Sequence, residues 1–239
     1  YSGTSENGGS NNVINGVINL PIVEDTLALR AVVYRYDNSG LYQNVAASDP
    51  VTSAAVATYS ALAVDSNDIG SNEVDGGRLS ILWQPSEQLS VNLSYLSQQI
   101  EQEGWGQADL ELAGDWSQRR LQVRKVDNTF TGEGFEDDIN ITNLTLEYDL
   151  SWATVLSSTS WADEKNKQNR SLDIFFGSYP WSQSTDYSGE IFSEEIRLVS
   201  EFDGAFQFLL GLYYEEKDTG LENFGLFGGT DLALNSFAP

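Results

Sequence analysis

Acidic side chains are the most abundant groups in this chain that could carry out chemistry. It contains 36 Asp and Glu residues against 12 Lys and Arg residues, which gives a formal net charge of -24, and it has neither His nor Cys. Nucleophilic sites built on Ser–His or Cys–His pairs are therefore excluded, as are zinc and iron sites with His ligands. The large negative charge also predicts that nucleic acid is not a partner.

Two pairs of carboxylates have a spacing that a glycoside hydrolase could use as its acid and base. Glu194 and Glu195 are adjacent, and adjacent side chains of a strand point to opposite faces, so these two cannot converge. Glu136 and Asp138 could share a face, but they close a predicted loop, where a solvated acidic patch is the simpler interpretation. No Walker loop or dinucleotide fingerprint is present. We therefore predict that the chain is not an enzyme and binds no cofactor.

A third acidic group lies in the stretch "DSNDIGSNEVDGG" (65–77). Asp65 and Asn67 have the spacing of a calcium loop, but Ile69 and Gly76 stand where that loop needs ligands. A solvated acidic loop is the favoured interpretation, so we predict no metal site. The alternative is a looser cation site that draws on Asp65, Asp68, Glu73 or Asp75.

The elements that must position these side chains are β-strands. In "LSVNLSYLS" (89–97), apolar residues occupy every second position and polar residues the positions between them. A period of two is typical of a strand with one apolar and one polar face. The same alternation predicts eight strands, at 12–22, 27–36, 76–84, 89–97, 139–148, 153–161, 192–200 and 206–216.

The connections between these strands alternate between short and long. The short turns are 23–26, 85–88, 149–152 and 201–205, and the long polar loops are roughly 37–75, 100–138 and 163–189. Outer-membrane barrels have short periplasmic turns and long external loops, whereas a soluble β-sandwich has no reason to gather its long loops at one end. We therefore predict an all-β fold, an antiparallel transmembrane β-barrel segment of about eight strands with long extracellular loops.

Aromatic residues recur where the predicted strands end, as they do where a barrel crosses the two surfaces of a membrane. Those at the short-turn ends are Trp83, Tyr148, Trp152 and Phe206, and those toward the long loops are Tyr36, Tyr95, Trp161 and Tyr214. Glu194, on an otherwise apolar face, is expected near the outer rim, where a charge costs little. The residues that we predict to face lipid are Leu79, Ile81, Trp83, Leu89, Val91, Leu93, Tyr95, Phe208, Leu210 and Leu212.

Four stretches together resemble the barrel of the TonB-dependent outer-membrane receptors of Gram-negative bacteria. They are "NGVINLPIVEDTLALRAVVYRYDNSGLYQNV" (15–45), "GGRLSILWQPSEQLSVNLSYL" (76–96), "LTLEYDLSWATVLSSTSW" (144–161) and "FSEEIRLVSEFDGAFQFLLGLYYEEKD" (192–218). The resemblance implies a 22-strand barrel in the outer membrane, filled by an N-terminal plug domain. It also implies active uptake of a scarce nutrient, such as an iron-siderophore chelate, a vitamin or an oligosaccharide, driven by a TonB complex.

Both ends of the chain fall in predicted extracellular loops. A complete eight-strand barrel should instead have both of its termini on the periplasmic side. We therefore expect residues 1–239 to be part of one β-barrel domain, with the plug domain before residue 1 and further strands after residue 239. The expected partners are outer-membrane lipid, the plug domain, the TonB complex and a small-molecule cargo. Cargo contacts are expected from loop aromatics, although loop packing explains them equally well; the candidates are Trp105, Trp116, Tyr179 and Trp181.

Three other functions remain open at this point. A passive porin would have the same strands without a plug or a TonB-contacting segment. A secreted, soluble β-rich carbohydrate-binding module would bury the apolar faces under protein instead of lipid. An outer-membrane hydrolase is the enzyme alternative, and the absence of His makes it a poor one for this segment.

Overall fold

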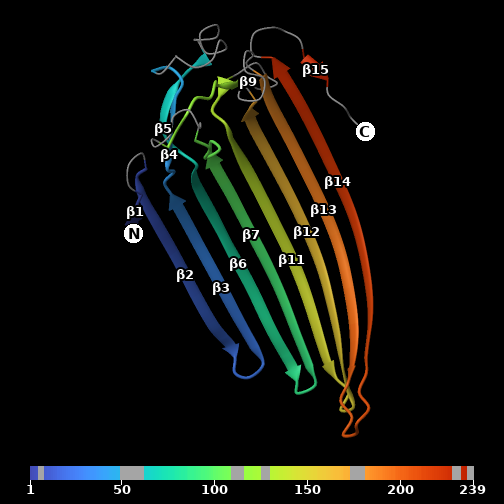
Figure 1. The fold of residues 1–239 in the computed structure, drawn as a ribbon. Coiled ribbons are helices and arrows are strands. Elements are labelled where there is room, and N and C mark those ends of the chain that lie inside the picture. The colour runs from blue at the N-terminus through green and yellow to red at the C-terminus, as the bar shows by residue number, and fades with distance from the viewer. Residues whose placement is uncertain are drawn as a thin grey trace.

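The computed structural model describes residues 1–4, 8–48, 62–108, 116–124, 130–172, 181–227 and 233–235. Ten strands form one sheet in which every hydrogen-bonded pair is antiparallel, in the order β1-β2-β3-β6-β7-β11-β12-β13-β14-β15. Each strand pairs with the next long strand along the chain, so the sheet is an uninterrupted meander (Figure 1). Among the described residues there is no helix with the length and apolar character needed to cross a membrane.

The sheet is built on eight long strands, and all eight strands predicted from the sequence are confirmed. The long strands are β2 (Ser10–Val23), β3 (Leu27–Asn38), β6 (Ser71–Ser86), β7 (Leu89–Glu103), β11 (Gly134–Asp149), β12 (Ala153–Ser171), β13 (Trp181–Ser200) and β14 (Leu209–Phe227). Short turns join them at one end, and the longer connections gather at the other (Figure 1). The short strands are β1 (Ser2–Gly3), β4 (Tyr42–Val45), β5 (Asp65–Ile69), β8 (Ser117–Gln118), β9 (Val123–Arg124), β10 (Phe130–Thr131) and β15 (Ala233–Asn235).

The long strands reach much further toward the long loops than the sequence predicted. β12 continues to Ser171 instead of residue 161, and β13 begins at Trp181 instead of residue 192. In these extensions both faces are polar, so no apolar alternation announces a strand. The extended backbone is held there by an unbroken ladder of cross-strand pairs, and strand formation depends on such tertiary pairing more than on local propensity.

One strand begins later than predicted. β14 starts at Leu209 instead of residue 206, because Gln207 folds back into a turn. Its amide nitrogen donates to the carbonyl oxygen of Phe202, and its amide oxygen accepts from the Ser200 hydroxyl at 2.9 Å. Phe208, predicted on a lipid-facing strand, therefore lies in this turn, with its ring 5.9 Å from that of Phe202.

The two faces of the sheet differ in how closely their side chains pack. On β7, Ser94 is 9% exposed, whereas its neighbour Tyr95 on the other face is 46% exposed. Asp137 of β11 lies on the same face as Ser94 and is also buried. Side chains converge on the concave side of a sheet that curves as a barrel wall does, so we assign the Ser94 face as inward and the Tyr95 face as outward.

Apolar side chains of the outward face lie at common levels across neighbouring strands. Leu93 pairs with Ile81 on one side and with Leu144 on the other, and Val91 is flanked in the same way by Trp83 and Leu146. The predicted alternation thus becomes an apolar band across the sheet, interrupted by Ser157 and Thr159 on β12 and by Glu194 on β13. The members of the band that the sequence singled out on β6, β7 and β14 are Leu79, Ile81, Trp83, Leu89, Val91, Leu93, Tyr95, Leu210 and Leu212.

Aromatic side chains border this band on the side of the long loops. Tyr95, Trp161 and Phe192 lie at one level, and the Tyr95 hydroxyl donates across it to Asn140 at 2.8 Å. Tyr36 does not belong to this border, because it lies on the inward face, where its ring is 5.6 Å from that of Tyr34. The aromatics therefore mark the edge of the apolar band and not the ends of the strands, which continue beyond them.

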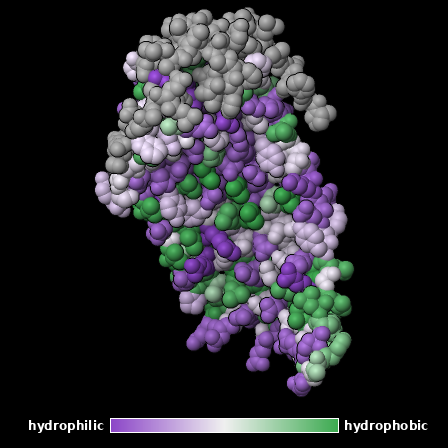
Figure 2. Space-filling view, in the orientation of Figure 1, coloured by the Kyte–Doolittle hydropathy of each residue, from purple (hydrophilic) through white to green (hydrophobic). Residues whose placement is uncertain are grey.

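A second aromatic border lies at the short-turn end of the sheet. Trp152 stacks on Phe202 with ring centroids 5.9 Å apart, and Phe206 is 72% exposed beside Phe208. Figure 2 shows apolar surface over this end of the sheet. The nine residue steps from Trp152, just before β12, to Trp161 span about 31 Å, or about 23 Å at a strand tilt of about 40°, close to the apolar height of an outer-membrane barrel.

Glu194 lies one row inside the upper aromatic border, at the level of Thr159 and below Phe192. The sequence predicted a position near the outer rim, and the carboxylate is close to that rim but within the band. It accepts hydrogen bonds from the Ser157 hydroxyl at 2.8 Å and from the Thr159 hydroxyl. These two donors on β12 satisfy one oxygen each, which explains how a carboxylate is accommodated among apolar neighbours.

On the inward face, a tyrosine crosses a glycine to reach the next strand but one. Tyr34 of β3 lies over Gly76 of β6, and its hydroxyl donates to the amide oxygen of Gln98 on β7 at 2.7 Å. A Cβ atom at position 76 would lie 2.4 Å from the Tyr34 ring. Glycine is therefore required at this position by close approach and not by backbone angle, and the contact links three strands.

Candidate functional site

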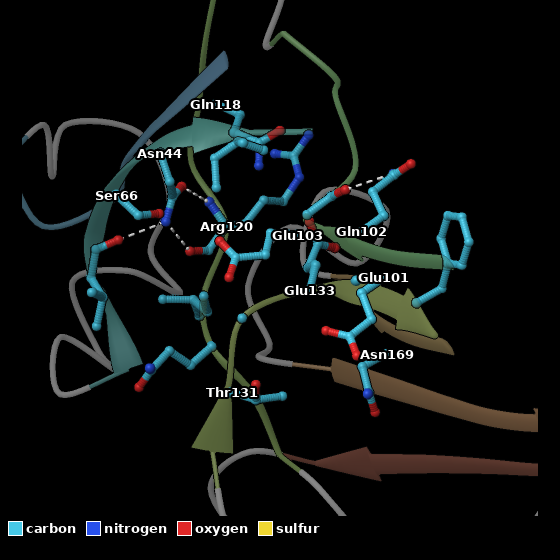
Figure 3. A pocket seen from close by; sticks show the side chains of 18 of the residues that line it. Asn44, Ser66, Glu101, Gln102, Glu103, Gln118, Arg120, Thr131, Glu133 and Asn169 are labelled. Carbon is cyan, nitrogen blue, oxygen red and sulfur yellow. Dashed lines mark hydrogen bonds between the residues drawn. The ribbon is translucent and has the colours of Figure 1, made fainter. Parts of the chain in front are cut away.

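The loop end of the sheet contains a cavity of about 390 Å³. It is enclosed by the ends of β7 and β11, by β5, and by the loop segments 116–124 and 130–134 (Figure 3). The sequence predicted that ligand contacts would come from loops at this end, and binding residues are commonly carried by loops on a rigid scaffold. The cavity is therefore the candidate ligand site of the chain.

Asn44 of β4 holds the loop segments around this cavity together. Its amide oxygen accepts from the backbone N–H of Arg120 at 2.7 Å, and its amide nitrogen donates to the carbonyl oxygens of Arg120 and Val64 at 2.9 and 2.6 Å (Figure 3). The residue is 8% exposed. One side chain thus joins the connection before β5 to the segment that contains β8.

We expect Asn44→Ala to loosen the loop cluster and leave the barrel strands intact. The substitution leaves the buried N–H and carbonyl of Arg120, and the carbonyl of Val64, without their partner, at a local cost of about 2 kcal/mol. Amide hydrogen exchange of the full-length protein should show faster exchange in 116–124 and unchanged exchange in β12. Asn67→Ala is the matched control, because the Asn67 side chain hydrogen-bonds to no described residue; equal effects of the two substitutions would contradict this role of Asn44.

Backbone and side-chain hydrogen bonds anchor the loop cluster to the barrel strands. The N–H of Gly104 donates to the carbonyl oxygen of Glu133 at 2.6 Å, and a carboxylate oxygen of Glu133 accepts from the N–H of Ser171 at 2.7 Å. Gln118 is 1% exposed, and in the orientation that satisfies its amide it donates to the carbonyl oxygens of Trp105 and Gln107 at 2.9 and 2.7 Å. The cavity walls are therefore fixed to the ends of β7 and β12.

Charged side chains of both signs line the cavity, with more carboxylates than cations. The carboxylates are Glu101, Glu103, Glu133 and Glu136, and the cations are Arg120 and Lys167. Arg120 is 6% exposed and donates from Nη1 to the carbonyl oxygen of Arg119 at 3.0 Å. Of these residues, the sequence singled out only Glu136, as one of a carboxylate pair. The others were not selected, because a charged residue in a polar loop has no pattern that distinguishes it from a solvated one.

None of the aromatic candidates within the described residues, Trp105, Trp116 and Trp181, lines the cavity. Trp105 is packed: its ring is 5.6 Å from that of Phe135, the Arg170 guanidinium lies 5.7 Å from its centre, and its indole N–H donates to the Asn169 carbonyl at 3.3 Å. Its role in the structure is to support Phe135, which does line the cavity.

The other aromatic candidates are spread over the loop end. Trp116 is 42% exposed and packs edge-on against Tyr42. Trp181 begins β13 and pairs with Phe227 of β14. Tyr179 lies outside the described residues. The structure thus brings Trp105 beside the cavity and places Trp116 and Trp181 on other parts of the loop end.

The acidic residues that could have formed a cation site are engaged separately. Asp68 accepts from the N–H of Gly40 at 2.7 Å, and Glu73 and Asp75 both pair with Arg35, at 2.5 and 3.3 Å. Asp65 accepts from the N–H groups of Ala47 and Ser48 at 2.8 and 3.1 Å. Within the described part of the chain, no group of three or more residues is arranged to hold a metal ion.

The hydrogen bonds of Asp65 make the start of the β4–β5 connection sensitive to acid. Desolvation acts to raise the pKa of the Asp65 carboxyl, but the hydrogen bonds from Ala47 and Ser48 outweigh it and lower the pKa below its ordinary value. A lowered pKa in the folded state stabilises this connection above the unfolded pKa of about 3.9, and the contribution is lost as the pH falls through the folded value.

We therefore expect the amides of Ala47 and Ser48 to lose protection from hydrogen exchange below about pH 4. Asp65→Asn should abolish this pH dependence and leave the protection low at every pH, because an amide oxygen is a weaker acceptor than a carboxylate. Protection in the Asp65→Asn protein that still changes with pH in this range would show that another group is responsible.

Comparison with known proteins identifies solved structures with a similar fold at low sequence identity. No family model and no curated protein matches the chain. It is similar to the ferric yersiniabactin uptake receptor FyuA from Yersinia pestis, with 13% sequence identity, a TM-score of 0.66, and coverage of 91% of this chain and 30% of that one. It is also similar to the siderophore receptor PiuA from Acinetobacter baumannii, with 18% identity, a TM-score of 0.57, and coverage of 94% and 30%.

The chain therefore spans slightly less than a third of the length of either receptor. At these identities the likeness concerns the path of the backbone and not the ligand. It agrees with the resemblance predicted from the sequence, with the meander of long antiparallel strands and with the gathering of loops at one end. The chain has the fold of a barrel segment of the TonB-dependent receptors.

Proposed function

We propose that residues 1–239 are part of the β-barrel domain of an outer-membrane transporter that takes up a scarce nutrient. The transporter is driven by a TonB complex and contains a plug domain, both outside this chain. The loop end captures the cargo, and the barrel wall surrounds the moving plug without covalent chemistry. The classes of cargo are an iron-siderophore chelate, a vitamin or an oligosaccharide.

The observation that carries this proposal is the outward apolar band with its two aromatic borders. A soluble protein rarely leaves an apolar surface of this extent uncovered, and Leu210, Leu212 and Tyr214 are each more than half exposed. Two tyrosine hydroxyls donate toward the loop end: Tyr95, in the upper border, donates to Asn140, and Tyr214, one row below the border, donates to Glu216. This is the arrangement that an aromatic girdle has at a lipid–water interface, so we assign the band to lipid.

The loop end supports the assignment of cargo capture. Its cavity opens among loops that are tied to the rigid ends of the strands, as described above for Glu133 and Gln118. Of the three aromatic candidates within the described residues, Trp116 has the exposure to meet a ligand directly, and Trp105 would act by supporting Phe135. The two similar receptors are named for siderophores, which makes an iron chelate one of the cargo classes to test.

The experiment that tests this function uses the native polypeptide from its own cells. We expect it in the outer-membrane fraction, with an intact mass several times the 26.3 kDa of this chain, and we expect its uptake activity to stop when the proton-motive force is collapsed. Uptake that continues without the proton-motive force would indicate a passive porin. Recovery in a soluble fraction at about 26.3 kDa would overturn the proposal.

A further inference from the structure

Several neutral hydrogen-bonding side chains that line the loop cavity are not used by the fold. Ser66 and Asn67 of β5, Gln122, and Thr131 of β10 make no side-chain hydrogen bond to another described residue. Each can both donate and accept, and they approach the cavity from three separate segments. Convergence of uncommitted amides and hydroxyls on one cavity is a feature of sites that recognise polar ligands.

A fifth group of the same kind comes from the barrel strand beneath them. Gln102 of β7 lines the cavity and donates its amide nitrogen to the carbonyl oxygen of Gly104 at 2.9 Å, which fixes the side chain and leaves its amide oxygen without a hydrogen-bond donor among the described residues (Figure 3). The hydrogen bond to Gly104 pre-orders this acceptor before any ligand enters. Pre-ordered polar groups lose less entropy on binding than mobile ones do.

The charge of the lining disfavours an anionic ligand. Four carboxylates and two cations give the lining a formal charge of -2, and the whole chain carries -24. Of the two cations, Arg120 is buried and directs a guanidinium N–H to the Arg119 carbonyl within its own loop, and Lys167 lies opposite the carboxylate-bearing Glu136 in the β11–β12 ladder. An anion would therefore enter a field of its own sign, whereas a neutral ligand would find carboxylates that accept hydrogen bonds from hydroxyl groups.

An aromatic side chain completes the lining. Phe135 lies at the cavity with Trp105 behind it, at a centroid separation of 5.6 Å, and the Arg170 guanidinium packs against Trp105 in turn. This stack fixes a flat apolar surface among amides and carboxylates. A pyranose ring needs this combination, because its hydroxyls require hydrogen-bonding partners around its edge and its C–H faces pack on an aromatic ring.

We propose that the cavity binds a neutral, hydroxyl-rich ligand, namely one or two sugar rings of an oligosaccharide. A volume of about 390 Å³ suits a fragment of that size, since ligand sites of about 300–1,000 Å³ are usual for small molecules. The inference rests on the proposed function, because it assigns one of the possible cargo classes to the same loop end.

The test is calorimetric titration of the full-length protein in detergent with oligosaccharides of two to four rings. The neutral probes are gluco-, xylo-, manno- and galacto-oligosaccharides, trigalacturonate is the anionic counterpart of the last, and ferric citrate is an anionic chelate. We expect at least one neutral probe to bind, and trigalacturonate to bind at least tenfold more weakly than the best neutral probe. Failure of every neutral probe, or preference for either anion, overturns the inference.

Two substitutions locate the binding. Gln122→Ala and Asn67→Ala should each weaken binding of the neutral probe about tenfold, as expected for the loss of one or two hydrogen bonds. Gln88→Ala, at the short-turn end of the sheet, is the matched control and should leave the affinity unchanged. Unchanged affinity in both loop variants places the sugar elsewhere and overturns the inference. Outer-membrane location and energised uptake are measured independently, so they can stand when this inference fails.

Discussion

Val91→Arg should cost the barrel about 2–4 kcal/mol of stability when the full-length protein is folded into lipid vesicles. Val91 lies in the middle row of the outward band, two rows below Tyr95, and is flanked by Trp83 and Leu146 at the same level. An arginine on the lipid face is most costly near the bilayer midplane, and the cost falls to about 0–1 kcal/mol near the interface. The measurement is the shift in the midpoint of guanidinium unfolding in vesicles, with refolding verified.

Ser97→Arg is the matched control for this prediction. Ser97 is on the same strand and the same face as Val91, and it lies one row above Tyr95, outside the apolar band. The two substitutions introduce the same charge at different heights, so a large cost at position 91 and a small cost at position 97 would locate the membrane boundary between them. Equal costs would contradict the assignment of the band to lipid and would favour a soluble protein or an interface with another protein.

Gly76→Val should destabilise the barrel by about 3 kcal/mol, because the new side chain clashes with the Tyr34 ring on the inward face of the sheet. Even a Cβ atom at this position would lie 2.4 Å from the Tyr34 ring, so the ring must swing away and give up its hydrogen bond to Gln98. Overpacking in a close contact costs about 1–3 kcal/mol, and the lost hydrogen bond adds to it. The same unfolding measurement in vesicles reports the change.

Two further variants separate this clash from the general effect of valine in a strand. Gly211→Val is the control within the same barrel, because a Cβ at position 211 meets no atom closer than 3.8 Å. In a Tyr34→Ala background, Gly76→Val should cost less than about 0.5 kcal/mol, since the atoms that it would strike are gone. A cost that persists in that background would assign the effect to the backbone of β6 and not to the tyrosine.

Much of the fold could be predicted because the part of each strand that crosses the apolar band carries its own signal. In 89–97 the apolar and polar faces must alternate, since one faces the band and the other faces inward. Beyond Trp161 both faces of β12 are polar, so the alternation of apolar and polar residues that distinguishes a strand from a loop is absent. The extensions of β12 and β13 depend on pairing between the strands and leave no local pattern.

The candidate site was much less predictable than the fold. Aromatic residues stand out in a polar loop, so Trp105 and Trp116 were selected, but one supports the cavity from behind and the other lies apart from it. Asn44 was not selected, because its importance comes from its hydrogen bonds to Arg120, which is 76 residues away in the sequence. Gln122 was not selected either, because its importance comes from having no side-chain hydrogen bond to a described residue. Neither property is visible in a stretch of sequence.

The unbroken ladder of β12 and β13 has a mechanical consequence. The pairing of the two strands runs without a register shift from Ala153 opposite Ser200, at one end, to Ser171 opposite Ser182, at the other. The register shifts between β2 and β3 and between β6 and β7 lie near the short turns. Because the ladder has no irregularity along its length, we expect the two strands to tilt together as a rigid unit and not to bend at their middle. A displacement of the loop end must therefore be absorbed by the loops themselves, or be transmitted along the two strands to the short-turn end of the sheet.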